Sequence, residues 1–516
     1  MGPPAGARDR IEPHVWRISL VVIVGAVMSI LDTTIVNIAL DSLSRDLHSP
    51  LSDIQWVATG YMLALAAVIP VSGWAAEKVG ARRLWIGSVV LFTLGSALCG
   101  AAWSTESLIV FRVLQGLGGG MVMPVGQMVL ARAAGPQRMG RVMSVVGVPM
   151  VLAPVFGPTI GGLLLEHLGW RWIFFVNLPI GVACVLGGAR VLHESRDEEH
   201  GGFDVFGFVF LSCGLFALVL GLLRGNDWGW SSGRVLGLFA AAAALLLAFV
   251  VAEWKQREPM LDLSLFRVPT FAGAQVVAFV ISSAMFSQFL YLTLYLQNVL
   301  GYSPIAAGVR FLPLSLLSFV AAPIAGRLSA RVPVRLLLGF GLVLIGGALL
   351  LMHGITVGSG WTTLLAGFLV GGVGIGMVNA PLASTAVSVV PPRRAGMASG
   401  INNTFRQVGI ATGIAALGAI FQSSIRADLA SKVPTGHVAQ LSRAVASGAT
   451  QQALAAVPRQ ARAATATAAR SAFVNGLNEI LLVAAFVALA GAVLAFVLVR
   501  RQDFVASGAP EAAAAA

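Results

Sequence analysis

Long apolar runs dominate the chain and recur at short intervals along most of it. Each run holds about 20 or more mostly apolar residues, the length that an α-helix needs to cross the hydrocarbon core of a membrane. The breaks between the runs are short and rich in Gly, Pro and charged residues. The pattern predicts an all-α membrane protein with fourteen transmembrane helices, at residues 17–40, 54–76, 84–103, 105–131, 141–166, 171–191, 205–224, 234–254, 269–296, 304–329, 333–353, 361–390, 396–421 and 471–500.

Lys and Arg are distributed unevenly between the runs, which predicts the orientation of the chain. An even number of spans places both termini on one side of the membrane, and the segments on that side hold most of the basic residues in short loops. Because such residues concentrate on the cytoplasmic side, we expect the termini, 1–16 and 501–516, to be cytoplasmic. The first run is too long for a cleaved signal peptide.

A weak internal repeat indicates how the spans are grouped. Residues 73–82, after the second span, align with residues 326–335, after the tenth, and Gly120 in the fourth span aligns with Gly376 in the twelfth. A chance match is the alternative, because Gly and Arg are common in this sequence. The repeat predicts two parallel six-helix bundles, formed by helices 1–6 and 9–14, with helices 7–8 inserted between them. The corresponding segments are an N-terminal bundle at 17–191, linkers with the inserted helices at 192–268, and a C-terminal bundle at 269–500 that includes an external, partly helical or disordered loop at 422–470.

Composition agrees with a protein whose main solvent is lipid. Of 516 residues, 57% are hydrophobic and 11% are charged, and the mean hydropathy is +0.85. These values exclude an ordinary soluble enzyme. The net charge of +12 comes from short clusters rather than a long basic stretch, so nucleic acid is not an expected partner. The sequence contains neither a Walker A motif nor a metal-ligating motif, so we expect no cofactor, no metal and no catalytic residues.

Asp32 lies well inside the first span, and it is the strongest candidate for proton chemistry. It lies about 15 residues, ~22 Å, from the cytoplasmic start of the first span, and Arg112 lies ~10 Å into the fourth span from the outside. Their depths match. Burial favours a neutral carboxyl group and a nearby guanidinium favours the ionised one, so moving the two apart or together would switch proton affinity. The alternatives are a permanent ion pair, or hydrogen bonds from Thr33 and Thr34 to Asp32.

Five segments together give the chain a resemblance to a known family across nearly its whole length. It resembles the fourteen-helix drug:proton antiporters of the major facilitator superfamily, although Glu77, Ala75, Ala81 and Ala153 depart from that family's pattern. The resemblance implies alternating access driven by a proton gradient. The segments are 31–40 (LDTTIVNIAL), 73–83 (GWAAEKVGARR), 112–119 (RVLQGLGG), 157–162 (GPTIGG) and 170–181 (WRWIFFVNLPIG).

Two of these segments are expected to control movement. In the segment 73–83, the acidic side chain of Glu77 could bind the positive N-terminus of a helix in the other half, near Gly396, and close the cytoplasmic gate. Plain positive-inside topology is the alternative. In the span that holds the segment 157–162, small residues recur every four positions and share one helix face, so close packing with a bend is predicted. The gate residues are Gly73, Glu77, Lys78, Gly80, Arg82 and Arg83, and the antiporter-helix residues are Ala153, Pro154, Gly157, Pro158, Gly161 and Gly162.

Polar and aromatic residues within the spans are candidates for lining a substrate cavity. Three intramembrane arginines against one deep acid predict a preference for neutral, zwitterionic or anionic amphiphiles over dications. Lipid-facing aromatic residues and arginines that bind backbone carbonyls are the alternatives. The candidates are Asn37, Trp56, Tyr61, Gln115, Gln288, Tyr291, Tyr295, Arg310, Asn402 and Arg406.

These features together predict a proton-coupled exporter of hydrophobic or amphipathic small molecules such as drugs and antibiotics. Its expected partners are the substrate, protons and the lipid bilayer, and we expect it to work as a monomer in a bacterial cytoplasmic membrane. An exporter of an endogenous lipid or secondary metabolite with the same fold is the first alternative. A membrane sensor without transport activity is the second.

Overall fold

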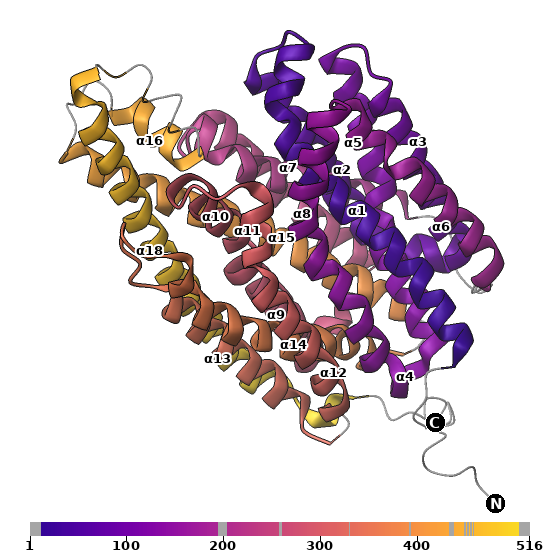
Figure 1. Ribbon diagram of the computed structural model, residues 1–516. Helices are drawn as coiled ribbons and strands as arrows, with labels where there is room; N and C mark the ends of the chain where they lie inside the picture. The colour runs from indigo at the N-terminus through magenta and orange to yellow at the C-terminus, as the bar shows by residue number, and fades with distance from the viewer. Residues whose placement is uncertain are drawn as a thin grey trace, which may run out of the picture.

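The protein folds into long helices that run side by side in two groups (Figure 1). The computed structural model describes residues 12–194, 204–256, 261–329, 331–391, 394–432, 438–447, 450, 454, 457 and 459–504, and every regular element in these ranges is helical. The first group comprises α1 (Pro13–Asp46), α2 (Leu51–Val79), α3 (Ala81–Gly100), α4 (Thr105–His167), α5 (Arg171–Phe175) and α6 (Asn177–Val191). Two further helices, α7 (Val205–Trp228) and α8 (Gly233–Lys255), follow it.

The second group has more interrupted helices. It comprises η1 (Leu263–Arg267), α9 (Pro269–Ile281), η2 (Ser282–Phe286), α10 (Gln288–Leu294), η3 (Tyr295–Val299), α11 (Pro304–Arg310), α12 (Leu312–Leu328), α13 (Val334–Met352), η4 (Trp361–Leu364), α14 (Leu365–Ser388), α15 (Ala395–Ala430), α16 (Val438–Ser447), α18 (Arg459–Leu498) and η7 (Arg501–Asp503). The elements η2 and η3 are π-helical turns. Each group encloses its own cluster of buried apolar side chains.

Twelve helices in the described part of the chain are long and apolar enough to cross a membrane, which confirms an all-helical membrane protein. Two of the fourteen predicted spans are not among the twelve. Residues 141–166 form the C-terminal part of α4, and residues 304–329 are divided between α11 and the 17-residue α12. The count of fourteen therefore stays a prediction.

The helix α4 is continuous in its secondary structure but reverses its direction. Arg112, near its start, contacts Asp32 of α1, and a Cβ atom added to Gly157, near its end, would lie 1.9 Å from Thr34 Oγ1 of the same helix. In a straight helix, a rise of ~1.5 Å per residue would separate these two positions of α4 by roughly 68 Å. The two ends of α4 therefore both pack beside the middle of α1.

Helix packing repeats between the two groups at the offset that the sequence repeat predicts. Gly120 of α4 approaches the backbone of Leu65 in α2, and Gly376 of α14 approaches the backbone of Ser318 in α12. In each case an added Cβ would lie within 3.0 Å of the carbonyl oxygen of the facing helix. Leu65 and Ser318 are separated by the same number of residues as Gly73 and Gly326. Glycine permits equivalent close helix contacts in both halves.

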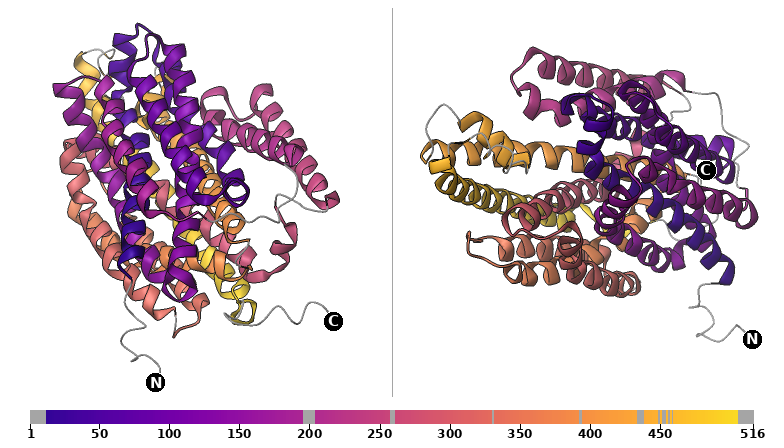
Figure 2. Two further views of the ribbon diagram at one scale, coloured as in Figure 1. Left: turned by 90° about the vertical axis from the view of Figure 1, so that its right-hand side faces the viewer. Right: turned by 45° about the horizontal axis from the view of Figure 1, so that its top comes forward.

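The inserted helices lie at one edge of the molecule, beside both groups (Figure 2). Ser212 Oγ of α7 donates a hydrogen bond of 2.8 Å to the carbonyl oxygen of Ala67 in α2. Asn226 Nδ2, closer to the other end of α7, donates one of 3.4 Å to the carbonyl oxygen of Ala415 in α15. The helix α7 therefore covers the seam between α2 and α15, and α8 packs against α7.

The described part of the predicted external loop is mostly helical. The 36 residues of α15 span ~54 Å, more than the ~30 Å of a hydrocarbon core, so this helix extends beyond the membrane. The helix α16 and the start of α18 lie at the end of the molecule to which α15 extends, whereas the start of α1 and the end of α18 lie at the opposite end (Figure 1). We refer to the end with the start of α1 and the end of α18 as the terminal end.

Candidate functional site

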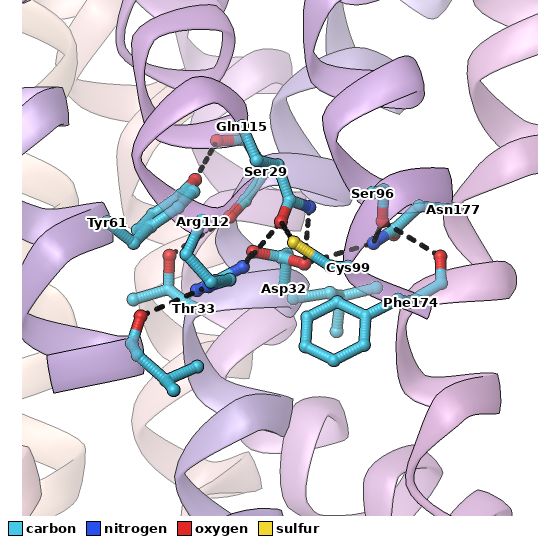
Figure 3. A network of polar contacts seen from close by, with 12 residues as sticks. Ser29, Asp32, Thr33, Tyr61, Ser96, Cys99, Arg112, Gln115, Phe174 and Asn177 are labelled. Atoms are coloured by element: carbon cyan, nitrogen blue, oxygen red, sulfur yellow. Dashed lines mark hydrogen bonds and ion pairs between the residues drawn. The ribbon is translucent and has the colours of Figure 1, made fainter. Parts of the chain in front are cut away.

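A buried network of polar side chains surrounds Asp32 in the first group of helices (Figure 3). Arg112 Nη1 of α4 donates to Asp32 Oδ2 at 2.5 Å, and Gln115 Nε2 of α4 donates to Asp32 Oδ1 at 2.9 Å. Asn177 Nδ2, from the first residue of α6, reaches the same Oδ1 at 3.1 Å and also donates to Ser96 Oγ of α3 at 3.0 Å. One carboxylate thus connects α1, α4 and α6.

The guanidinium of Arg112 has several partners besides the carboxylate. Nη1 also donates to Gln115 Oε1 at 2.7 Å, and Nε donates to the carbonyl oxygen of Val57 in α2 at 3.3 Å. Its Cζ lies 4.1 Å from the centre of the Tyr61 ring and 5.6 Å from that of Phe174. Amide, carbonyl and aromatic groups can therefore keep this cation in place when its interaction with the carboxylate weakens.

Asp32 and Arg112 form the ion pair that their matched depths predict, and this pair is common to the proton-switch interpretation and to the alternative of a permanent pair. Thr33 Oγ1 donates to the carbonyl oxygen of Ser29, and Thr34 Oγ1 donates to that of Leu31. The carboxylate takes its amide and guanidinium donors from other helices instead. An ion pair this deeply buried is costly unless its remaining hydrogen-bonding capacity is satisfied.

Sequence reasoning missed Asn177 and Ser96 as members of this network. Asn177 belongs to the segment 170–181, which carried the family resemblance but was given no role of its own. An amide among apolar residues at the start of a buried helix was the available signal. Ser96 gave no comparable signal, because a serine in a helix often bonds its own backbone.

The antiporter-helix residues pack against α1 next to the network. A Cβ atom at Gly161 would lie 2.9 Å from Ile35 Cγ2, and Gly157 makes the closer approach to Thr34 described above. Gly162 faces open space, with nothing within 4 Å of an added Cβ. The side chains of Ala153, Pro154 and Pro158 lie outside the described residues.

The basic residues of the gate motif bind within their own half. Gly80, between α2 and α3, has a φ of 103°, which favours glycine. Arg82 Nη2 donates to the carbonyl oxygen of Ala189 near the end of α6 at 2.7 Å, and Arg83 Nε lies 3.5 Å from Glu194 Oε2. Lys78 Nζ lies 5.4 Å from the centre of the Trp74 ring.

Of the two remaining members of this motif, Gly73 lies next to α15. Gly73 is part of α2 where this helix passes α15, since a Cβ at Gly400 would lie 3.7 Å from Gly73 N. Glu77 belongs to α2, but its side chain lies outside the described residues. Its contact with the helix that begins near Gly396 stays a prediction.

Three of the cavity candidates serve packing inside the second half. Gln288 Nε2 donates to the carbonyl oxygen of Ile480, Tyr291 Oη to that of Ile414, and Tyr295 Oη to that of Ser359. Each of the three is at least nine-tenths buried. Their part in lining a substrate cavity stays a prediction.

The other candidates occupy varied places. Tyr61 and Gln115 belong to the Asp32 network. The centre of the Trp56 ring lies 4.5 Å from the guanidinium Cζ of Arg224 in α7. The side chain of Asn37 is outside the described residues. In the second half, Asn402 Nδ2 donates to Gln275 Oε1 at 3.2 Å. Arg310 stacks on Tyr302 at 3.4 Å, whereas Arg406 Nη2 donates to Asn379 Oδ1 at 2.9 Å.

The two halves are joined toward the terminal end by a side-chain contact. Gln127 Oε1 of α4 accepts from Ser399 Oγ of α15 at 3.1 Å and from Asn403 Nδ2 at 2.9 Å. At the residue after Ser399 in α15, a Cβ added to Gly400 would lie 3.4 Å from the carbonyl oxygen of Pro70 in α2. The halves are therefore closed against each other on this side.

A second polar contact at the terminal end ties the linker before α9 to the start of α15. Asp262 Oδ1 accepts from the backbone N–H of Ser264 at 2.8 Å, and Asp262 Oδ2 pairs with Arg394 Nη1. Burial alone would raise the pKa of Asp262, but the hydrogen bonds from Ser264 and the Arg394 guanidinium outweigh it and hold this pKa below its usual value.

The Asp262–Arg394 pair gives a testable pH dependence. A carboxyl whose pKa is lowered by folding stabilises the folded state at neutral pH, and this contribution is lost as the pH falls through the lowered pKa. We expect Asp262→Asn to lower stability by up to about 1 kcal/mol at pH 7, because the pair is partly exposed, and to have no effect in strong acid. Thermal unfolding across pH measures this difference. An equal difference at every pH would contradict it.

Repeated groups of membrane-spanning helices that meet at one end, with a carboxylate buried between helices, define a membrane transporter rather than an enzyme. The chain belongs to the Major Facilitator Superfamily, whose family model matches residues 22–414. This finding confirms the resemblance seen in the sequence.

Individual relatives agree with this assignment. The chain is 40% identical to the "Multidrug resistance protein B homolog" of Mycobacterium tuberculosis strain H37Rv, over 80% of this chain and 78% of the relative. It is 34% identical to the "Tetracenomycin C resistance and export protein" of Streptomyces glaucescens, over 82% of this chain and 78% of the relative. Among solved structures, the proton:xylose symporter XylE shares the fold, with a TM-score of 0.58, 14% identity, and coverage of 86% of this chain and 96% of that one.

Proposed function

We propose that the protein is a proton-coupled exporter of hydrophobic or amphipathic small molecules, including drugs and antibiotics. The observation that carries the proposal is the fully buried Asp32 carboxylate, which is held by donors from α4 and α6. The printed names of the two curated relatives, which refer to multidrug resistance and to export, support the choice of substrate class.

Proton coupling follows from what one proton would do to this network. Ionised Asp32 attracts the Arg112 guanidinium and draws α1 toward α4 and α6. Protonation neutralises the carboxylate and removes most of this attraction, while Gln115 and the Val57 carbonyl still hold the guanidinium. The relative stability of two arrangements of these helices would then depend on whether the proton is bound, as an alternating-access antiporter requires.

The proposal includes fourteen spans with both termini in the cytoplasm of a bacterium. The C-terminal part of α4 supplies one additional span, and α11 with α12 supplies the other. Protons and the substrate are the only small partners that the mechanism requires, and one chain contains the whole pathway. Accessibility of single cysteines placed at both ends of the bundle, in intact cells, tests the orientation.

Transport by the purified protein tests the main proposal. The protein is reconstituted into proteoliposomes, and movement of a panel of neutral and charged hydrophobic compounds is measured with and without an imposed pH gradient. We expect uphill movement that requires the gradient and stops when a protonophore collapses it. Uphill movement unaffected by the protonophore, or no movement of any compound, would contradict the proposal.

Export of a self-made secondary metabolite is the second candidate function. It is favoured by the relative from Streptomyces glaucescens, whose printed name couples resistance to export of tetracenomycin C. Adding aromatic polyketides to the panel distinguishes the two. Transport confined to one such class would favour this second function over broad drug export.

The contact between Gln127 and α15 provides a test of alternating access. Gln127→Ala removes two hydrogen bonds between the halves, each worth about 0.5–1.5 kcal/mol. We expect opening of the terminal end to become at least about fivefold more populated. Distances between spin labels on α2 and α15 measure this population. The control is Gln297→Ala, whose side chain makes no hydrogen bond to any described residue, and equal populations in the two variants would contradict the prediction.

A further inference from the structure

Arg406 is a cation in the middle of the second half without an acidic partner among the described residues. It lies ~17 Å along α15 from Ala395, roughly half the thickness of a hydrocarbon core. Its hydrogen bond goes to the neutral amide of Asn379, and its Cζ lies 5.7 Å from the centre of the Phe286 ring. Arg112, by contrast, is paired with Asp32. A charge kept within a membrane span without a counter-charge is expensive and calls for a functional explanation.

The position of Arg406 along α15 places it on the face that meets the other half. Ser399, Asn403 and Arg406 are spaced by four and then three residues, so they share one face of the helix. The first two bind Gln127 of α4. Arg406 follows less than one turn farther from the terminal end and remains partly exposed. Its backbone therefore lies on the face of α15 that meets α4, while its guanidinium reaches Asn379 of α14.

Aromatic side chains extend from Arg406 into the second half. The rings of Phe286 and Phe289, both partly exposed, lie 5.9 Å apart, and Phe289 lies 5.6 Å from Phe311. Phe286 ends the π-helical turn η2, where α15 comes so close that a Cβ at Gly413 would lie 2.5 Å from the carbonyl oxygen of Ser283. Such π-turns occur often at functional sites. A cation next to an aromatic surface matches an aromatic molecule that carries an anionic group.

We propose that Arg406 and the Phe286–Phe289 pair form an anion-recognition site, which makes aromatic organic acids a preferred substrate class. This inference rests on the proposed transport function and names part of its substrate site. The anionic group would take the guanidinium donors that Asn379 does not use, and the aromatic part would lie on the phenylalanine rings. A cationic molecule of similar size would be repelled by Arg406.

A pair of probes with the same aromatic skeleton tests the site. Anilinonaphthalene sulfonate is an anion, and phenylnaphthylamine is its neutral counterpart without the sulfonate. Binding of both is measured to the full-length protein in nanodiscs, against empty nanodiscs, without a pH gradient. We expect the wild type to bind the sulfonate more tightly, and Arg406→Gln to lower the ratio of the two affinities by about tenfold, the effect of losing one charge-assisted hydrogen bond.

Two further variants separate this role from a structural one. Arg406→Lys keeps the charge and should retain part of the ratio. Arg426→Gln removes an exposed arginine of the same helix, ~30 Å farther along α15, and should leave the ratio unchanged. Tetraphenylphosphonium, a cation, should bind more tightly to Arg406→Gln than to the wild type.

The outcomes distinguish the site from the transport function. The inference is overturned if the wild type does not favour the sulfonate, or if folded Arg406→Gln keeps the wild-type ratio. It is also overturned if Arg426→Gln lowers the ratio equally. If the ratio changes as expected but neither probe moves uphill in proteoliposomes with a pH gradient, the anion site stands and the proposed antiport fails.

Discussion

Asp32→Asn is expected to abolish uphill export driven by a pH gradient, while the protein stays folded in the membrane. An amide has nearly the shape of a carboxylate and its oxygen can still accept a hydrogen bond, but it cannot take up a proton. The network would then remain in one charge state throughout the cycle. Downhill exchange of substrate should persist, because binding and helix movement do not themselves require the proton.

The fold should tolerate this substitution because Arg112 has other partners. Gln115 Oε1 and the carbonyl oxygen of Val57 still accept from its guanidinium, and the Tyr61 ring still covers it. The variant resembles the state that proton binding would create. A charge buried without any partner would instead cost several kcal/mol and reduce the amount of folded protein.

Transport in proteoliposomes measures the effect of Asp32→Asn directly. Uphill efflux and downhill exchange of one compound are compared at equal amounts of folded protein. Asp428→Asn is the matched control, since Asp428 pairs with Lys432 near the end of α15 outside the network and should transport as the wild type does. Full uphill efflux by Asp32→Asn would show that the coupling proton is carried elsewhere.

The pairing of Asp32 with Arg112 could be predicted because depth in a membrane can be counted along a helix. Each residue adds a fixed rise, so two intramembrane charges at equal depth are natural partners. The approach of Gly157 to α1 was foreseeable only in part. Spacing identifies a face of small residues, but it does not identify the helix that this face contacts.

The facing of residues around a helix axis was harder to predict, and the second half shows why. Gln288, Tyr291 and Tyr295 follow the π-helical turn Ser282–Phe286, which inserts an additional residue into the helical repeat. Every residue beyond such a turn is rotated by ~100° from the face that regular spacing predicts. Apolar composition does not reveal the turn, so the hydrogen bonds of these three side chains to backbone carbonyls of other helices and loops could not be predicted from spacing.

The number of spans is hard to predict for a different reason. A hydropathy window measures how apolar a segment is, but it does not show whether the helix is continuous. Residues 304–329 are mostly apolar, yet the helix they form is divided between α11 and α12. The repeat was more robust, because close contacts such as those of Gly120 and Gly376 exclude larger side chains in both halves and so leave a pattern in the sequence.

Gly157→Ala is expected to impair both stability and transport, whereas Gly162→Ala should do neither. Both substitutions raise helix propensity by the same amount, about 1 kcal/mol. They differ in the room available for the new Cβ atom. At Gly157 it would lie 1.9 Å from Thr34 Oγ1 and 2.8 Å from Thr34 Cβ, whereas at Gly162 nothing lies within 4 Å of it. Comparing the two variants isolates the cost of the steric clash.

The clash should separate α4 from α1 within a turn of Asp32. Overpacking of this kind typically costs about 1–3 kcal/mol, and a shift of α1 would lengthen the contacts of Asp32 with Gln115 and Asn177. We therefore expect Gly157→Ala to unfold at a lower temperature than Gly162→Ala and to export at a small fraction of its rate. Thermal unfolding in detergent and proteoliposome transport measure the two effects.

A second substitution tests whether Thr34 is the obstacle. Thr34→Ala removes Oγ1, the nearer of the two contacting atoms, and leaves the Cβ contact at 2.8 Å. The double variant Gly157→Ala/Thr34→Ala should therefore recover part, but not all, of the lost stability and transport. Recovery would locate the effect at the α1–α4 contact beside the carboxylate. If Gly157→Ala and Gly162→Ala behave alike, close packing at this position is not required for transport.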